Sequence, residues 1–319
     1  FAEVLCERLG GEWVDCPAHD AMGESITARY ALCGTTAVME MSEASGIRLI
    51  PDDQRDIWQA NTIGTGEMMR PAIEHSGVKR ITLGIGGSVT NDAGCGMASV
   101  LGSKFLNSDG NELAPTPREL LKCASVDLSG MIELPENLAA CDVDNPLLGE
   151  NGATSIYGPQ KGAGEEDIDR LDDLLGMVAK LAGGNDLAAL PGAGAAGGLG
   201  FGLMQFCAAE LLPGFDLVAQ ETGLVKKIHD ADIVITGEGK LDAQTLQGKG
   251  PAGVAVMARD AGKQVAAVAG IIEPAALHLF DYAYALHDDG RPLEETIARS
   301  NELLEYAAVE LGRKLADKS

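Results

Sequence analysis

The chain has 319 residues, of which 45% are hydrophobic and 23% charged, a composition typical of a globular protein with one large or two medium domains. Its formal net charge of −24 would repel both a nucleic-acid backbone and an anionic membrane surface, so we expect a small-molecule partner instead. Seven cysteines without a CxxC spacing indicate reduced thiols in a cytoplasmic protein, and no zinc site or disulfide framework.

The first 85 residues alternate helical and strand patterns. A helical pattern over residues 1–9 ends at Gly10-Gly11, a pair typical of a helix C-terminus. Strand patterns bounded by turn residues follow at 12–17, 25–32 and 37–41. Residues 64–75 have helical periodicity, and the apolar segment 78–85 predicts a strand that runs into a glycine-rich loop, with a helix from about Asn91.

The remaining chain becomes more regular toward its end. A short apolar run covers 138–143, an amphipathic helix covers 165–181, and a glycine-interrupted helix covers 198–212. From Asp232 a strict alternation follows: strand 233–236, helix 251–260, strands 265–269 and 282–286, and a terminal helix from Pro292. This alternation predicts βαβ units with a parallel sheet, and therefore an α/β fold.

The segment from Asp232 to Pro251, DIVITGEGKLDAQTLQGKGP, is the densest cluster of polar groups after a buried strand. Ligands of open α/β sheets bind outside the carboxyl ends of the strands. The segment is therefore a candidate active-site loop, although a solvated glycine-rich connection is the alternative. Its candidate residues are Gly237, Glu238, Gly239, Asp242 and Lys249.

A second glycine-rich loop, GIGGSVTNDAG, follows the strand at 78–85. Gly86, Gly87 and Ser88 can bring backbone N–H groups close to an anion, and the following helix start adds a positive dipole end. Asn91 and Asp92 are candidates for the same site. The alternative for either residue is a structural role as the N-cap of that helix.

Two further segments suit phosphate chemistry. Asp142 and Asp144 follow the apolar run at 138–143, and such carboxylates suit Mg²⁺, although an Asx turn before Pro146 is equally consistent. Lys161, within YGPQKGA, is a candidate phosphate ligand.

Common nucleotide signatures fit poorly. The P-loop pattern fails at Lys249, because Ala243 and Gly250 occupy its glycine and Ser/Thr positions. A GxGxxG match at Gly192, Gly194 and Gly197 lacks a clear preceding strand. This match nevertheless leaves an NAD(P)-dependent oxidoreductase as the alternative function.

Taken in order, these segments resemble the glycerate kinase family, the type I bacterial enzymes. The resemblance implies ATP-dependent phosphorylation of D-glycerate with Mg²⁺, and it favours 2-phosphoglycerate over 3-phosphoglycerate as product. It also implies two α/β domains, a flavodoxin-like parallel-sheet domain from residues 1–16 and 220–319 and an inserted mixed domain from 17–219, with the active site in the cleft. The matching segments are Glu40–Gly46 (EMSEASG), Thr62–Glu67 (TIGTGE), Gly84–Gly96 (GIGGSVTNDAGCG), Ala140–Gly149 (ACDVDNPLLG), Tyr157–Ala163 (YGPQKGA), Pro191–Gly200 (PGAGAAGGLG) and Ile235–Pro251 (ITGEGKLDAQTLQGKGP).

Within this resemblance, the residues divide by role. Asp242 is the first choice for the carboxylate that accepts the proton of the attacking hydroxyl, and Asp92 the second. Lys249, Lys161 and the backbone of Gly86–Ser88 would offset phosphate charge. The family opens with a strand, a helix and a glycine-rich acidic loop before the position of Phe1. We therefore expect the N-terminal part of the first domain to be missing and the activity to be impaired, with a non-catalytic ligand-binding remnant as a further alternative.

Overall fold

The structure, a computed structural model, describes residues 1–242, 250–287 and 290–316. It divides into two compact units, Phe1–Gly214 and Phe215–Ser319, and each unit has its own sheet and core. The mixed α/β class expected from the sequence is confirmed. In the described part of the chain, no helix combines the length and the apolar character needed to cross a membrane.

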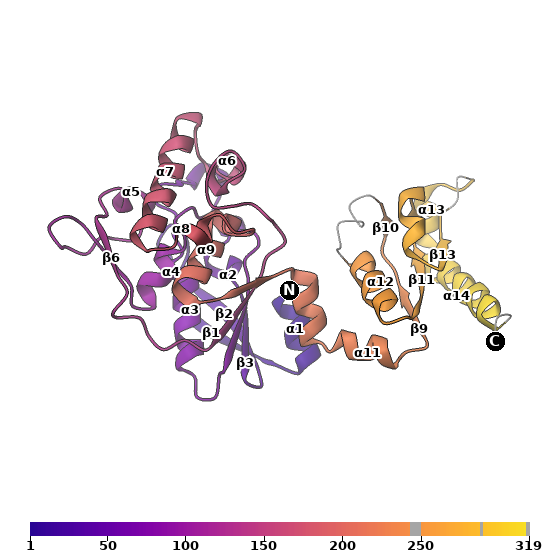
Figure 1. Cartoon of the computed structure of the whole chain (residues 1–319). Helices are drawn as coiled ribbons and strands as arrows, with labels where there is room; N and C mark the ends of the chain where they lie inside the picture. Colours follow the sequence, from indigo (N-terminus) through magenta and orange to yellow (C-terminus); the bar gives the residue numbers. More distant parts are fainter. Residues whose placement is uncertain (243–249, 288–289, 317–319) are drawn as a thin grey trace. The chain divides into compact units, whose positions relative to one another are not determined.

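The first unit is built on a six-stranded sheet of order β1-β2-β3-β4-β7-β8. β1, β2 and β3 are antiparallel neighbours, whereas β3, β4, β7 and β8 run parallel to one another. The carboxyl ends of β3, β4 and β7 therefore lie at the same edge. The strands are β1 (Glu12–His19), β2 (Ser25–Cys33), β3 (Thr36–Glu40), β4 (Arg80–Gly84), β7 (Glu136–Ala140) and β8 (Glu210–Leu212), with a separate hairpin of β5 (Lys104–Leu106) and β6 (Ser125–Asp127) (Figure 1).

Helices and single turns connect these strands. The helices are α1 (Ala2–Leu9), α2 (Ser42–Ser45), α3 (Ile63–Glu74), α4 (Cys95–Val100), α5 (Pro117–Leu120), α6 (Ala153–Tyr157), α7 (Glu165–Leu181), α8 (Asn185–Ala188) and α9 (Ala195–Cys207), and the 3₁₀ turns are η1 (Ile47–Leu49), η2 (Asp52–Gln54) and η3 (Pro159–Lys161). The predicted helices at 64–75 and 165–181 are confirmed as α3 and α7.

Two predicted helices differ in their limits. The helix expected from Asn91 begins only at Cys95, because Ala93 and Gly94 adopt left-handed φ angles of 54° and 72°. The helix expected over 198–212 ends at Cys207, because Ala208 adopts a left-handed φ of 50° and releases the chain into β8.

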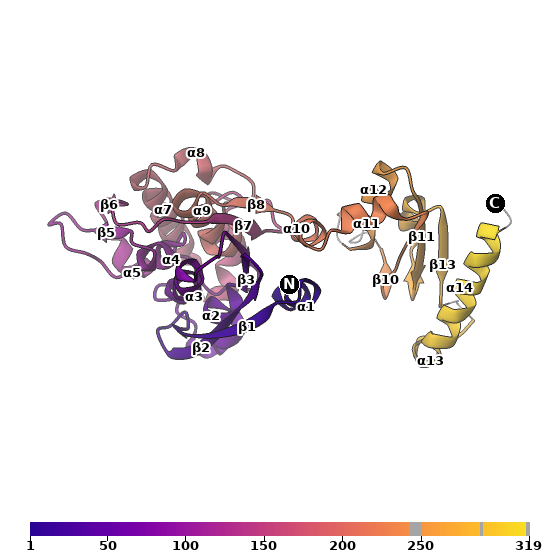
Figure 2. The ribbon, with the colours of Figure 1, turned by 90° about the horizontal axis from the view of Figure 1, so that it is seen from below.

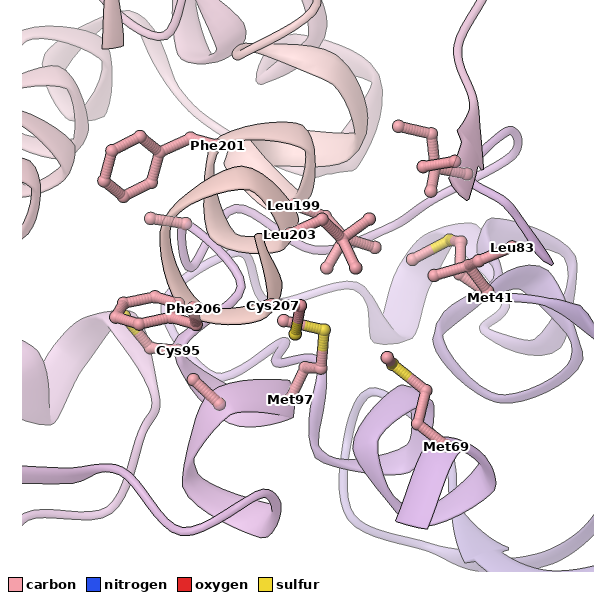
Figure 3. Packing of buried hydrophobic residues seen from close by; sticks show 14 of the residues in the cluster. Met41, Met69, Leu83, Cys95, Met97, Leu199, Phe201, Leu203, Phe206 and Cys207 are labelled. Carbon is pink, nitrogen blue, oxygen red and sulfur yellow. The ribbon is translucent and has the colours of Figure 1, made fainter. Parts of the chain in front are cut away.

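The core of the first unit lies between the sheet and helices α3, α4 and α9 (Figure 3). Met69 of α3, Met97 of α4 and Phe206 of α9 all belong to this core. Phe206 packs edge-to-face against both Phe105 and Phe201, with ring centroids 6.2 and 6.3 Å apart. This packing joins α9 to β5.

The N-terminal segment was expected to share a domain with residues 220–319. In the structure, residues 1–16 lie in the compact unit that ends at Gly214. The reason is local burial: Ala2, Leu5 and Cys6 are buried where α1 packs on β2 and β3, and β1 begins at Glu12. The assignment of a flavodoxin-like and an inserted domain stays a prediction.

The second unit has a three-stranded parallel sheet of order β13-β11-β9, with a short parallel pair formed by β10 and β12. α12 packs on one face of β11 through Ala255 and Ala258, and α14 packs on the other through Leu311 (Figure 2). The predicted βα alternation is confirmed, except that the terminal helix is broken at Arg299. The elements are α10 (Gly214–Glu221), α11 (Leu224–Asp230), β9 (Ile233–Thr236), β10 (Lys240–Leu241), α12 (Pro251–Asp260), β11 (Gln264–Ala269), β12 (Ile271–Ile272), η5 (Pro274–Leu279), β13 (Tyr282–Ala285), α13 (Leu293–Ala298) and α14 (Ser300–Ala316).

Candidate active site

A pocket of about 320 Å³ opens in the first unit where the parallel strands β4 and β7 end. The loop after β4, the loop after β7, η3 and the start of α9 converge there because the strands share a direction. Its polar and backbone lining comes from Gly86, Gly87, Ser88, Cys141, Asp142, Tyr157, Gln160, Lys161, Ala195 and Ala196. An adjoining hollow shares Gly86, Gly87 and Asp142 with the pocket and adds Glu40 from the end of β3, Ser42 from α2 and Arg48 from η1.

Lys161 is the principal charged group of this pocket. Its side chain is 1% exposed, and its Nζ donates to Ser88 Oγ at 2.9 Å and to the carbonyl of Thr90 at 2.8 Å. No carboxylate within the described residues lies within ion-pair distance of it. Burial lowers the pKa of Lys161 to about 7, although the charge of Asp92 opposes this shift. An anion entering the pocket would therefore stabilise the protonated ammonium.

The Gly86–Ser88 turn presents its backbone to the same pocket. Gly87 has a left-handed φ of 75°, and a Cβ at Gly86 would meet no atom within 4 Å. The turn is held by backbone pairing with residues 46–47 of the same chain, since Ile47 N donates to the Gly87 carbonyl at 2.8 Å and Gly46 forms a β-bridge with Ser88. Among the described residues, no hydrogen bond is donated by the amides of Gly86 and Gly87, so both suit an anion.

Asp92 lines neither hollow. It is 1% exposed, and its carboxylate accepts hydrogen bonds from the Thr62 amide and hydroxyl and from the amides of Gly94 and Gly96, at 2.8–3.2 Å. Burial raises the pKa of Asp92, against the effect of these hydrogen bonds. Because Gly96 lies in the first turn of α4 and Thr62 precedes α3, the carboxylate fastens the starts of two helices. The structural role considered for Asp92 is therefore the one the geometry favours.

Asn91 is likewise buried and donates to Thr154 Oγ1 at 3.0 Å, so it joins the Gly84–Gly94 loop to α6. It does not line either hollow. Both Asn91 and Asp92 therefore connect the Gly84–Gly94 loop to neighbouring helices and do not line the pocket.

Of the two predicted metal carboxylates, only Asp142 faces the pocket. It lines both hollows, and its Oδ1 accepts from the Gly214 amide at 2.8 Å, whereas Asp144 lines neither; both residues are exposed. No group of three His, Cys, Asp or Glu side chains gathers as a metal cage in the part of the chain that the structure describes. Mg²⁺ is commonly held by one or two carboxylates together with water and substrate phosphates, and Asp142 fits that donor set.

The GxGxxG segment has a packing role. The helix α8 precedes it where a dinucleotide fingerprint needs a strand. A Cβ at Gly194 would lie 2.2 Å from the Pro146 carbonyl oxygen, and one at Gly197 would lie 1.8 Å from the Thr90 carbonyl oxygen. Gly192 and Gly194 do not line the hollows. These glycines let the start of α9 approach the Gly84–Gly94 loop, which brings Ala195 and Ala196 to the pocket wall.

The candidate loop of the second unit follows β9. Its backbone is tied to the next strand, since Gly270 N donates to the Glu238 carbonyl at 3.2 Å and Ile271 N donates to the Gly239 carbonyl at 3.0 Å. Gly237 is required there, because a Cβ would lie 2.2 Å from the Val268 carbonyl oxygen.

An ion-pair cluster follows this loop. The Nζ of Lys240 lies 2.7 Å from Glu273 Oε1 and 3.2 Å from Asp242 Oδ2. These two carboxylates, Glu273 first, raise the pKa of Lys240. Lys249 lies outside the described residues.

Comparison with known proteins decides the family. A family model described as the glycerate kinase family matches residues 1–316. The chain belongs to the glycerate kinase family. It is 41% identical to a glycerate kinase of Halalkalibacterium halodurans over 96% of this chain and 83% of that protein, and 43% identical to glycerate 2-kinase of Escherichia coli over 81% and 68%. A crystal structure assigned as glycerate kinase 2 of Salmonella typhimurium LT2 is 37% identical, with a TM-score of 0.86 over 100% of this chain and 87% of that chain.

Membership of the glycerate kinase family confirms the resemblance predicted from the sequence and makes the protein a kinase. The oxidoreductase alternative is wrong, since it rested on the GxGxxG segment, whose glycines serve close packing.

Sequence reasoning missed several residues that line the candidate pocket of the first unit or join the ion-pair cluster of the second. Tyr157 lines the pocket and donates to Asn145 Oδ1 at 2.8 Å, and Arg48 and Glu40 line the adjoining hollow. Glu40 and Tyr157 could have been predicted from the sequence, because they lie in segments that carry the family resemblance. The ion pair between Lys240 and Glu273 could not be predicted from the sequence, because it depends on the contact between β10 and β12.

Proposed function

We propose that this chain transfers the terminal phosphoryl group of ATP to D-glycerate and yields 2-phosphoglycerate. The relatives named as glycerate kinases support the substrate, and the similarity to glycerate 2-kinase of Escherichia coli supports the position of the phosphate. The observation that carries the proposal is Lys161: a buried ammonium group, with no carboxylate partner among the described residues, lines a pocket beside the Gly86–Ser88 turn.

The pocket of the first unit is suited to an anionic group of the reactants. Lys161, Ser88 and the amides of Gly86 and Gly87 would hold a carboxylate or phosphoryl oxygen, and they are fixed before the ligand arrives. Preorganised donors in a site with little water stabilise negative charge more strongly than water does. Phosphoryl transfer depends mainly on such positioning and charge neutralisation.

The proton of the attacking hydroxyl needs a carboxylate acceptor. Asp242 remains our candidate, because it is partly exposed, follows a parallel strand, and lies beside the Lys240 ammonium. Asp92 is less suited, since both of its oxygens already accept hydrogen bonds. Asp142 would hold Mg²⁺, which when bound neutralises charge on the phosphates of ATP.

The test is an assay of ADP release by the purified protein with ATP, Mg²⁺ and D-glycerate. Phosphorus NMR of the product, checked with enolase, which consumes 2-phosphoglycerate and not 3-phosphoglycerate, identifies the phosphorylated hydroxyl. ADP release that depends on D-glycerate and yields 2-phosphoglycerate would support the proposal. A product of 3-phosphoglycerate would overturn the regiochemistry, and binding of D-glycerate without turnover would favour the non-catalytic alternative.

A further inference from the structure

Arg55 makes an unusual set of backbone contacts close to the pocket. Its Nε donates to the Ile50 carbonyl at 3.3 Å, its Nη2 to the Ile47 carbonyl at 3.4 Å, and its Nη1 to the Gln160 carbonyl at 3.2 Å. The same guanidinium lies 2.6 Å from Asp52 Oδ1, and the side chain is only 17% exposed. Three carbonyl groups from two distant chain segments therefore share one side chain.

Both segments contribute directly to the pocket. Ile47 lines it, and its amide donates to the Gly87 carbonyl, so the segment held by Arg55 is paired with the Gly86–Ser88 turn. Gln160 also lines the pocket and immediately precedes Lys161. Lys161 Nζ itself donates to Ser88 Oγ. The segment that contains Lys161 is therefore connected to the Gly86–Ser88 turn in two ways: directly through Lys161, and indirectly through Arg55 and Ile47.

A second close approach supports the same connection. Gly162 has a left-handed φ of 98°, and a Cβ there would lie 3.1 Å from the Arg55 carbonyl oxygen. The backbone after Lys161 therefore runs directly against the backbone of Arg55. Arg55 lines neither hollow, so it does not face the ligand itself.

We propose that Arg55 is a positioning residue of the kinase site, which sets the spacing between Lys161 and the Gly86–Ser88 turn. A guanidinium suits this task because its planar fork directs several N–H groups in fixed directions, which an ammonium group cannot reproduce. The Lys161 ammonium must meet a reactant anion at a defined distance, and a misplacement of about 1 Å can cost on the order of 100-fold in rate. The proposal rests on the proposed anion-binding role of Lys161.

A double-mutant cycle on kcat/KM for D-glycerate tests this proposal, using Arg55→Met, Lys161→Met and the double variant. Arg55→Met is expected to lower kcat/KM by roughly 10–100-fold, because the ammonium is misplaced. If Arg55 acts through Lys161, the double variant loses no more than Lys161→Met alone. Arg70→Met is the matched control: Arg70 also donates to a backbone carbonyl, but to that of Val100, which lines neither hollow, so its effect is expected to add to that of Lys161→Met.

Two further variants keep the test decisive if Arg55→Met folds poorly. Arg55→Lys retains the charge but not the fork, and is expected to stay impaired and to show the same non-additivity with Lys161→Met. Guanidinium ion is expected to restore part of the activity of Arg55→Ala and none of that of Lys161→Met. Additive losses, or an unchanged kcat/KM in Arg55→Lys, would overturn the positioning role while leaving the proposed function. An unchanged kcat/KM in Lys161→Met would instead overturn the anion-binding role of Lys161.

Discussion

The polar groups at the carboxyl ends of the parallel strands are held in opposite ways in the two units. In the first unit Asp92 and Lys161 are each 1% exposed, and their charged groups form hydrogen bonds with buried neighbours. In the second unit Lys240 is 49% exposed and is held by ion pairs with Asp242 and Glu273. Buried polar groups interact strongly and are costly to leave unpaired, whereas exposed pairs are screened by water. The comparison therefore predicts that the first group supports the fold as well as the chemistry, and the second the chemistry alone.

The largest expected effect concerns the second unit. Asp242→Asn is expected to lower kcat by about 10²–10⁴-fold, the usual cost of losing a general base, with little change in KM. The unfolding midpoint should not move, because the side chain is partly exposed. Steady-state kinetics and thermal unfolding check this, with Asp232→Asn before β9 as control. A near-wild-type kcat would remove Asp242 from the mechanism.

Asp92→Ala tests the opposite behaviour in the first unit. It removes the acceptor for the amides of Thr62, Gly94 and Gly96, so we expect the free energy of unfolding to fall by about 3–5 kcal/mol. Urea unfolding measures this, and Asp109→Ala, at an exposed turn, is the control. A loss below about 1 kcal/mol would show that the two units do not differ as the comparison requires.

The pH dependence of stability sharpens the comparison further. The pKa of Lys161 is about 7 in the folded protein, below its usual value of 10.5, so the unfolded chain binds more protons between these values. Stability contributed by this group therefore rises with pH across that window, by up to about 1.4 kcal/mol per pH unit, and is constant below pH 7. The difference in unfolding free energy between wild type and Lys161→Met should show this slope. The variant Lys180→Met, at an exposed position of α7, should not show it. A flat difference for Lys161→Met would contradict the burial of its charge.

The smallest effect is expected at Lys240. Lys240→Met removes two exposed ion pairs, so the unfolding midpoint should match that of wild type. The kcat is expected to fall by less than about 10-fold, and the fall should shrink at high salt because screening already weakens these pairs. Unfolding and kinetics at two ionic strengths check this, with Lys226→Met as control. A clear drop in the midpoint would mean that this cluster supports the fold after all.

Much of the fold was predictable because its signals are local. The strands at 12–17, 25–32 and 37–41, the helix at 165–181 and the βα alternation after Asp232 follow from the spacing of apolar residues, which depends only on the period of each element. The limits of α4 and α9 were not predictable in this way. Left-handed turns at Ala93 and Ala208, which are not glycines, are imposed by packing and not by residue type.

The order of motifs along the sequence was by itself sufficient to determine the family, and the residue types of the Gly86–Ser88 and YGPQKGA segments indicated an anion site. Only the tertiary structure decided which of these residues reach the pocket. It placed Lys161 beside Ser88 across 73 positions of sequence, turned Asp92 inward to fasten two helices, and used Gly194 and Gly197 for close packing. The reason is physical: residue type sets what a side chain can do, but burial, hydrogen-bond partners and pKa depend on neighbours that are remote in sequence.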